Sequence, residues 1–152
     1  MNLIDSLYEV EYNPFQYGST IASFYSSFFG VKNSILLLPL IIPVCTHPHL
    51  RRKIVHGKSS SRLETLFSSH IEYCDLTERI VAFRKLSFDS LLVAVANDWL
   101  TIDVKNLSIH PGLNLTFSQD KVASKLAALF LNREFSEILF FLGVSPNEMF
   151  DS

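Results

Sequence analysis

The histidines are the first residues in this sequence whose type and spacing suggest chemistry. Three of the five lie close together, at His47, His49 and His56, and an imidazole nitrogen is a common zinc ligand. A zinc site needs three or four ligands at a recognised spacing, and this His-x-His pair, on an expected loop, lacks the remaining ones. We therefore interpret the cluster as solvated or hydrogen-bonded histidines and expect no metal.

No other group of side chains has the spacing of an active site. The sequence contains no phosphate-binding glycine loop, no recognised nucleophile–base pair and no metal motif. Catalysis requires titratable groups that converge on one point, and a small hydrolase has only a generic Ser and His content in its favour. We expect a protein without catalytic residues or a cofactor, and not an enzyme.

The densest positive charge lies in one short segment. Arg51, Arg52 and Lys53 are consecutive, and Lys58 and Arg62 follow closely. Such a segment can bind nucleic acid or an acidic surface of a protein. The alternative is a solvated helix face, because short basic runs are common and exposed charges contribute little to folding. These five residues are the predicted contacts with a partner or with DNA.

The composition limits what such a contact can be. The 13 basic and 15 acidic residues give a net charge of −2, which argues against a domain whose main work is binding phosphate backbones. Apolar residues make up 48% of the chain and charged ones only 18%, so the chain folds and has apolar surface to offer a partner. The 152 residues suit a single domain, with an N-terminal helical part at 1–57 and a second part at 58–152.

Cysteine usage and the longest apolar run indicate a cytoplasmic protein. Cys45 and Cys74 form no CxxC pattern, and no signal peptide precedes them, so we expect both to be reduced and buried. The apolar run at 35–44 is about half as long as a bilayer span and contains Pro39 and Pro43. It predicts a buried segment and no membrane.

Helical patterns cover most of the chain. Asn13 and Pro14 form a helix start, and the spacing after them predicts a helix over 13–29 with Phe24 on its buried face. Further helices are expected after a serine cap at 59–61, after Asp75, and from Ser87 or Asp89, the last burying a stripe of apolar residues. That stripe comprises Leu91, Leu92, Val95 and Trp99.

The pattern then changes to alternation at 100–104, and again at 107–109 or 113–115, which predicts a β-hairpin that turns at 105–106. Helices at 118–131 and 133–142, stopped by Gly143 and Pro146, complete the chain. The predicted class is mainly α with a small β-hairpin. Three helices before a hairpin suggest a winged-helix-like domain with additional N- and C-terminal helices.

A winged-helix domain raises the alternative of a DNA-binding transcriptional regulator. Its recognition helix would be 89–98, which contains no Arg or Lys. Those side chains commonly read bases in the major groove. A winged-helix fold used for protein contacts therefore fits better.

Five segments, taken in order, resemble one family, the middle components of three-component ABC systems, which include the small subunit of Lamassu anti-phage defence complexes. After Leu40 that family tends to show His-Lys and a Thr-Arg pair, whereas this chain continues PVCTHP at 43–48. The segments that carry the resemblance are NPF at 13–15, LLPL at 37–40 before a basic stretch, the helical segment 76–86, SFDSL at 87–91 and FLGVSP at 141–146.

The resemblance implies a non-catalytic adaptor. Such a subunit is encoded between an SMC/Rad50-like ABC ATPase and an effector, often a nuclease, and bridges the two. It also implies that DNA is met through the assembled complex. The absence of an active-site motif and the surplus of apolar residues agree with that role.

Overall fold

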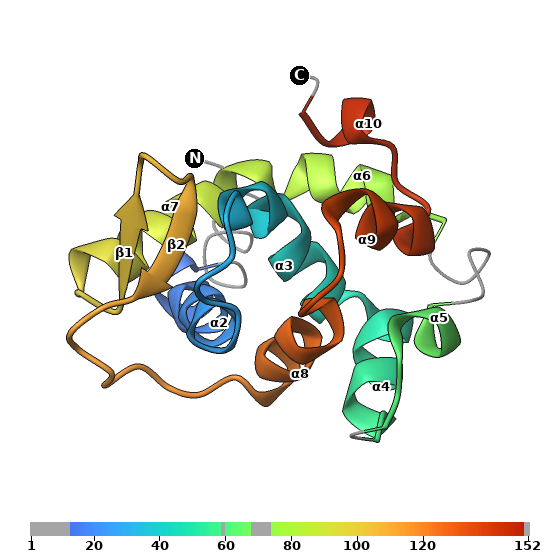
Figure 1. Cartoon of the computed structure of the whole chain (residues 1–152), viewed down its shortest axis with the longest axis horizontal. Coiled ribbons are helices and arrows are strands. Elements are labelled where there is room, and N and C mark those ends of the chain that lie inside the picture. Colours follow the sequence, from blue (N-terminus) through green and yellow to red (C-terminus); the bar gives the residue numbers. More distant parts are fainter. Residues whose placement is uncertain (1–12, 59, 68–73, 151–152) are drawn as a thin grey trace, which may run out of the picture.

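A computed structural model describes residues 13–58, 60–67 and 74–150 of the chain. It is mainly helical with one two-stranded antiparallel sheet (Figure 1), as the sequence predicts. In chain order the elements are α2 (Pro14–Ser27), η1 (Ser34–Leu37), α3 (Leu38–Thr46), α4 (Pro48–His56), α5 (Leu63–Leu66), α6 (Leu76–Ala82), α7 (Arg84–Ala96), β1 (Leu100–Asp103), β2 (Ser108–Pro111), α8 (Lys121–Phe130), α9 (Phe135–Leu142) and α10 (Pro146–Phe150).

Helix α2 lies at the centre and packs on α3, α7, α8 and both strands. Its predicted start is confirmed, because the Asn13 side chain accepts a 2.8 Å hydrogen bond from the amide of Phe15. The ring of Phe24 is fully buried and lies 6.1 Å from that of Phe130 on α8. Tyr25 is also buried, and its hydroxyl donates to the carbonyl of Ser34 at 2.8 Å. That bond offsets the cost of burying a phenol oxygen.

The apolar run after α2 forms η1 and the buried helix α3, which keeps its helical course despite the internal Pro43. Helix α4 follows after a sharp bend. No single helix in the described part of the chain is long and apolar enough to cross a membrane. The pair Ser34–Thr46 and Pro48–His56, bent by 89°, does pass that test on length and composition.

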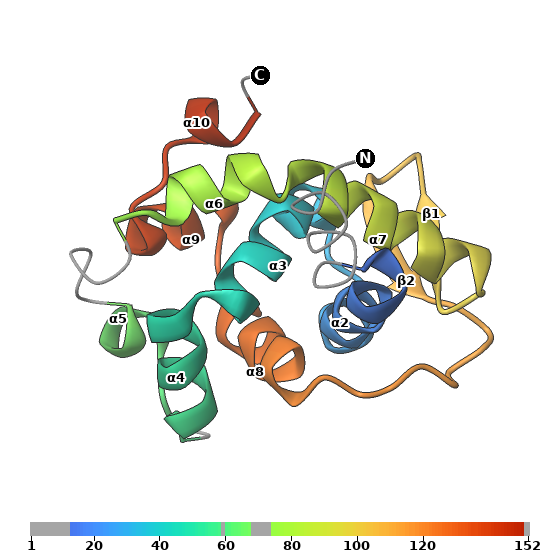
Figure 2. The ribbon, with the colours of Figure 1, turned by 180° about the vertical axis from the view of Figure 1, so that it is seen from behind.

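The winged-helix arrangement is not confirmed. A helix-turn-helix joins its two helices by a turn of three or four residues at a steep angle, whereas only Phe83 separates α6 from α7. Figures 1 and 2 show the two helices running in line along one side of the molecule. Helix α7 also begins earlier than predicted, at Arg84.

The expected apolar stripe of α7 is only partly right. Leu91 is buried, but Leu92 is 56% exposed. Ser87 and Ser90 on α7 are buried as well. At Gly18 of α2 an added β-carbon would lie 3.4 Å from the carbonyl oxygen of Ser90 and 3.1 Å from Val93, so the two helices approach closely there. Trp99, expected in the core, is partly buried and packs against it beside Phe117.

The hairpin pairs Leu100 with Pro111 and Asp103 with Ser108, close to the predicted positions. The turn between the strands spans 104–107. The other edge of β2 is covered by the segment before α3, because the amide of Ile109 donates to the hydroxyl of Ser34 at 3.0 Å. The hairpin is thereby attached to the core.

The C-terminal helices largely follow the sequence pattern. Asp120 caps α8 by accepting from the amides of the first turn. Helix α9 ends at Gly143, which has φ of 70°, the left-handed conformation that favours glycine. Pro146, predicted to stop the last helix, is also the first residue of a further helix, α10.

Gly112 provides a test of how the hairpin joins α7. Its amide donates to the carbonyl of Trp99 at 2.8 Å, and an added β-carbon would lie 2.0 Å from the carbonyl oxygen of Asp98. We predict that Gly112→Ala lowers the free energy of unfolding by more than about 1 kcal/mol, because the backbone must shift. Urea denaturation measures the change, with Leu113→Ala at a fully exposed position as control. Equal stability of the two variants would contradict this packing.

Candidate partner interface

The predicted basic segment is the helix α4, where the sequence suggested a loop around its histidines. His47 is 2% exposed and caps this helix. Its Nδ1 accepts from the amides of His49 and Leu50 at 3.2 and 3.4 Å. An imidazole here takes the role that Ser, Thr, Asp or Asn usually has, which explains why the helix start was missed.

The other nitrogen of His47 joins α4 to α6. Because Nδ1 accepts backbone hydrogen bonds, the proton lies on Nε2, which donates to Asp75 Oδ1 at 2.7 Å. This hydrogen bond lowers the pKa of Asp75. Asp75, predicted to cap α6, makes no side-chain cap there. Its carboxylate instead accepts from the imidazole N–H of His47, the cap of α4.

Two arginines reinforce the same bend. Arg51 Nη1 donates to the carbonyl of Cys45 at 3.2 Å, and Arg79 Nη2 donates to the Thr46 hydroxyl at 2.8 Å. Cys45 is buried as predicted, and burial raises the pKa of its thiol well above the usual value. Cys74, also predicted to be buried, is exposed. Neither cysteine forms a disulfide.

The bend separates the five predicted contact residues into different surroundings. Consecutive helical positions differ by about 100°, so Arg51, Arg52 and Lys53 do not share one face. Arg51 turns back to the bend, Arg52 is exposed and Lys53 is half-buried. Lys58 and Arg62 are exposed in the segment after α4. The structure therefore places the five residues around α4 and not in a single patch.

Two lysines of α8, which the sequence analysis did not identify, add to the positive charge around α4. Lys121 and Lys125 are four residues apart and so lie on one helix face. Helix α8 packs against α4 (Figures 1 and 2), and Lys125 Nζ donates to the carbonyl of Val55 at 3.0 Å. The spacing of these lysines on the predicted helix was the available signal.

Two grooves border α4. The first, of about 690 Å³, is mostly polar and includes Arg51 and Lys121. Its carboxylate, Asp120, is engaged by the hydroxyl of Thr20 at 2.8 Å and by the first amides of α8. The second groove, of about 470 Å³, lies between α4 and α8 and includes Lys58 and Lys125. The first groove therefore contains cations and one carboxylate, whereas the lining of the second combines cations with neutral side chains.

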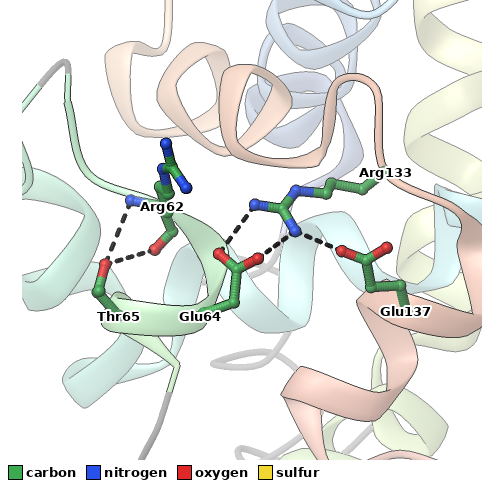
Figure 3. Close-up of polar contacts among 5 residues, drawn as sticks. All are labelled: Arg62, Glu64, Thr65, Arg133 and Glu137. Carbon is green, nitrogen blue, oxygen red and sulfur yellow. Dashed lines mark hydrogen bonds and ion pairs between the residues drawn. The ribbon is translucent and has the colours of Figure 1, made fainter.

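The short helix α5 is fixed beside this surface by an ion-pair network (Figure 3). Arg133 Nη2 donates to Glu64 Oε2 at 2.8 Å, and Nη1 contacts the carboxylates of both Glu64 and Glu137. The hydrogen bond to Arg133 lowers the pKa of Glu64. Figure 3 shows that Arg62 contacts Thr65 through its backbone only. The Arg62 guanidinium is thus left for other contacts.

The described ranges contain no group of three or more His, Cys, Asp or Glu side chains placed to hold a metal ion. His47 and His49 are neighbours, with ring centres 5.8 Å apart, but the Nδ1 of His47 is occupied by backbone amides. The surface around α4 thus offers charged side chains and two grooves for contact with another macromolecule.

A family model described as ABC-three component (ABC-3C) system Middle Component 3 matches residues 1–146. The chain belongs to this family. The resemblance to the middle components of three-component ABC systems is thereby confirmed, and the chain is a partner of the other components of such a system. No curated protein and no solved structure gives a significant match to this Middle Component 3 chain.

The His47 cap gives a stability prediction. We expect His47→Ala to lower the free energy of unfolding by about 1–2 kcal/mol, because α4 loses its cap and its bond to α6. His47→Asn retains a capping group and should recover part of the loss. Urea denaturation measures both, with the exposed His49→Ala as control. Equal stability of His47→Ala and His49→Ala would show that the cap does not hold this bend.

The Glu64 network gives a pH prediction. The pKa of Glu64 is lowered in the folded protein, so the ion pairs stabilise the fold above the unfolded pKa of about 4.3, and this stabilisation is lost as the pH falls through the folded pKa. Glu64→Gln should lower stability at pH 7 and flatten the acid side of the stability profile. Thermal unfolding between pH 3 and 7 tests this, with exposed Glu134→Gln as control. Parallel profiles for Glu64→Gln and the parent would contradict it.

Proposed function

We propose that this middle component is a non-catalytic adaptor of a Lamassu-type anti-phage defence complex. In this proposal it bridges a bacterial SMC/Rad50-like ABC ATPase and an effector, often a nuclease. It works in the cytoplasm, and it meets DNA through the assembled complex. The family membership supplies the middle-component assignment, the resemblance of the sequence supports the Lamassu type and its partners, and the exposed surface supports the bridging role.

The observation that carries the proposal is the exposed apolar surface. Five of the 13 phenylalanines are exposed, although burying such a side chain is worth about 1.5–3 kcal/mol. Exposed aromatic groups are typical anchors of protein interfaces. The exposed phenylalanines are Phe15, Phe29, Phe88, Phe140 and Phe150.

Two exposed apolar groups lie far apart, as a bridging subunit requires. The hairpin turn and the segment after it expose Val104, Leu113 and Leu115, while α9 exposes Phe140. Figure 1 places the hairpin at one end of the longest axis and α9 toward the other. Two partners can therefore bind without competing for one site.

Catalysis in this proposal belongs to the partners. The buried His47 is occupied as a helix cap, and the buried thiol of Cys45 has a raised pKa. A thiol that stays protonated is a poor nucleophile. Arg51, Arg52, Lys53, Lys58 and Arg62 remain the predicted contacts with a partner or with DNA.

The alternative of a transcriptional regulator gains little from the structure. The outer face of α7, which would be its recognition helix, exposes Phe88 and Leu92. Those side chains suit a protein surface better than a DNA groove rich in phosphate charge. Sequence-selective, salt-sensitive DNA binding by the isolated chain would favour the regulator.

The bridging role predicts separable losses of partners. From cells that carry the full operon, the tagged chain should co-purify with the ATPase and the effector and bury over about 1,000 Å² against them. We expect Leu113→Glu with Leu115→Glu to release one partner and Phe140→Glu to release the other, because a charge in an apolar contact is costly to desolvate.

The controls place one glutamate at a neighbouring exposed polar position of each surface, Thr116→Glu and Ser136→Glu, and should retain both partners. Quantified subunit ratios after gel filtration give the result. Recovery of the chain alone, with the partners expressed and soluble, would refute the adaptor role. Release of both partners together by either apolar-surface variant would refute two separate contact surfaces.

A further inference from the structure

The groove between α4 and α8 has an apolar floor and a basic rim. We call it the α4–α8 groove. Its volume is about 470 Å³, and Ile54, Leu66 and Leu129 are among the apolar residues that line it. Lys58 and Lys125 also line it, from the segment after α4 and from α8. The groove thus combines an apolar contact surface with two positive charges.

The charge of this groove is not neutralised by its own lining. None of the described residues that line it is Asp or Glu. The nearest acidic residue in sequence, Glu64, does not line the groove and is bound by Arg133 (Figure 3). The Nζ of Lys125 donates to the Val55 carbonyl at 3.0 Å, which holds the side chain in place. An occupant with carboxylates would therefore meet complementary charge.

The apolar floor of the α4–α8 groove favours a protein partner over nucleic acid. Nucleic acid is bound through phosphates by exposed cations and needs no apolar groove beneath them. An amphipathic helix, in contrast, places apolar side chains at i, i+3 or i+4 into a groove while its polar edge faces the rim. The lining of the α4–α8 groove matches the second case.

We propose that the α4–α8 groove receives an acidic amphipathic helix from a protein partner. Apolar side chains of that helix pack on Ile54, Leu66 and Leu129, and its carboxylates face Lys58 and Lys125. The inference rests on the proposed function, because it assigns a surface to one partner of the adaptor. It also predicts that Lys58, one of the five predicted contact residues, contacts a carboxylate of a protein and not a phosphate of DNA.

Photo-crosslinking identifies the occupant directly. The photoreactive residue p-benzoylphenylalanine replaces Ala128, an exposed residue lining the groove, in the full chain expressed with its operon. Exposed Ala96 on α7 is the control position. We expect Ala128 to crosslink to a partner segment whose acidic residues flank apolar residues at helical spacing. Crosslinks to DNA, to a segment without carboxylates, or to nothing in a recovered complex would overturn the proposal.

Matched charge variants test the energetics. Lys58→Glu with Lys125→Glu should weaken binding of the partner crosslinked at Ala128 by about tenfold or more, because attraction becomes repulsion. Added salt, which screens that repulsion, should then strengthen the remaining binding, whereas it weakens binding of the parent. Lys32→Glu with Lys85→Glu makes the same charge change at exposed positions elsewhere and should leave binding unchanged. Ala128→Trp fills the groove without a change of charge and should also weaken binding.

The outcomes separate this inference from the adaptor role. If the unmodified chain recovers no partner, both proposals fall. If it recovers its partners and the groove variants bind as well as the parent, only the groove proposal falls. Circular dichroism checks folding, and where the double lysine variant loses helical signal, the result for Ala128→Trp decides.

Discussion

The course of the chain from α3 into α4 depends on one capped bend. The buried helix α3 ends inside the protein, where unpaired backbone groups are costly. The His47 side chain accepts hydrogen bonds from the first amides of α4 and so begins that helix. The same ring donates to Asp75 at 2.7 Å, so α6 is attached at the same point. Arg51 and Arg79 bond the last turn of α3. Together with the burial of Leu50 and Ile54, these contacts set the direction of α4.

That fixed direction determines what the protein can present to partners. Helix α4 lies against α8, and the cations of both helices surround the α4–α8 groove and its polar neighbour. The apolar ends of the molecule, at the hairpin and at α9, are separate from this basic surface. In the proposed adaptor role, these separate surfaces let a middle component of an ABC-three component system bind more than one of the other components.

Local rules in the sequence predicted much of the fold, and contacts distant in sequence account for the errors. Asn13, the hairpin and Gly143 were identified correctly because a cap, an alternation and a left-handed glycine act within a few residues. The hydrogen bond between His47 and Asp75 was missed because the two residues are 28 positions apart in sequence. The buried stripe of α7 was misjudged because small serines, and not only apolar residues, are buried on it. The sequence also could not show that the lysines of α8 lie near α4, because the two helices meet only in the tertiary structure.

The central claim is that separate surfaces of this one chain are covered by different partners. Hydrogen–deuterium exchange of the chain, alone and in the purified complex, measures this most directly. In the complex, two separated regions should be protected from exchange, the segment 104–119 and the helices at 135–150. When one partner is omitted, the protection of the region that it covers should be lost and that of the other region kept. Protection confined to one region, or unchanged by omission of either partner, would contradict a bridging role.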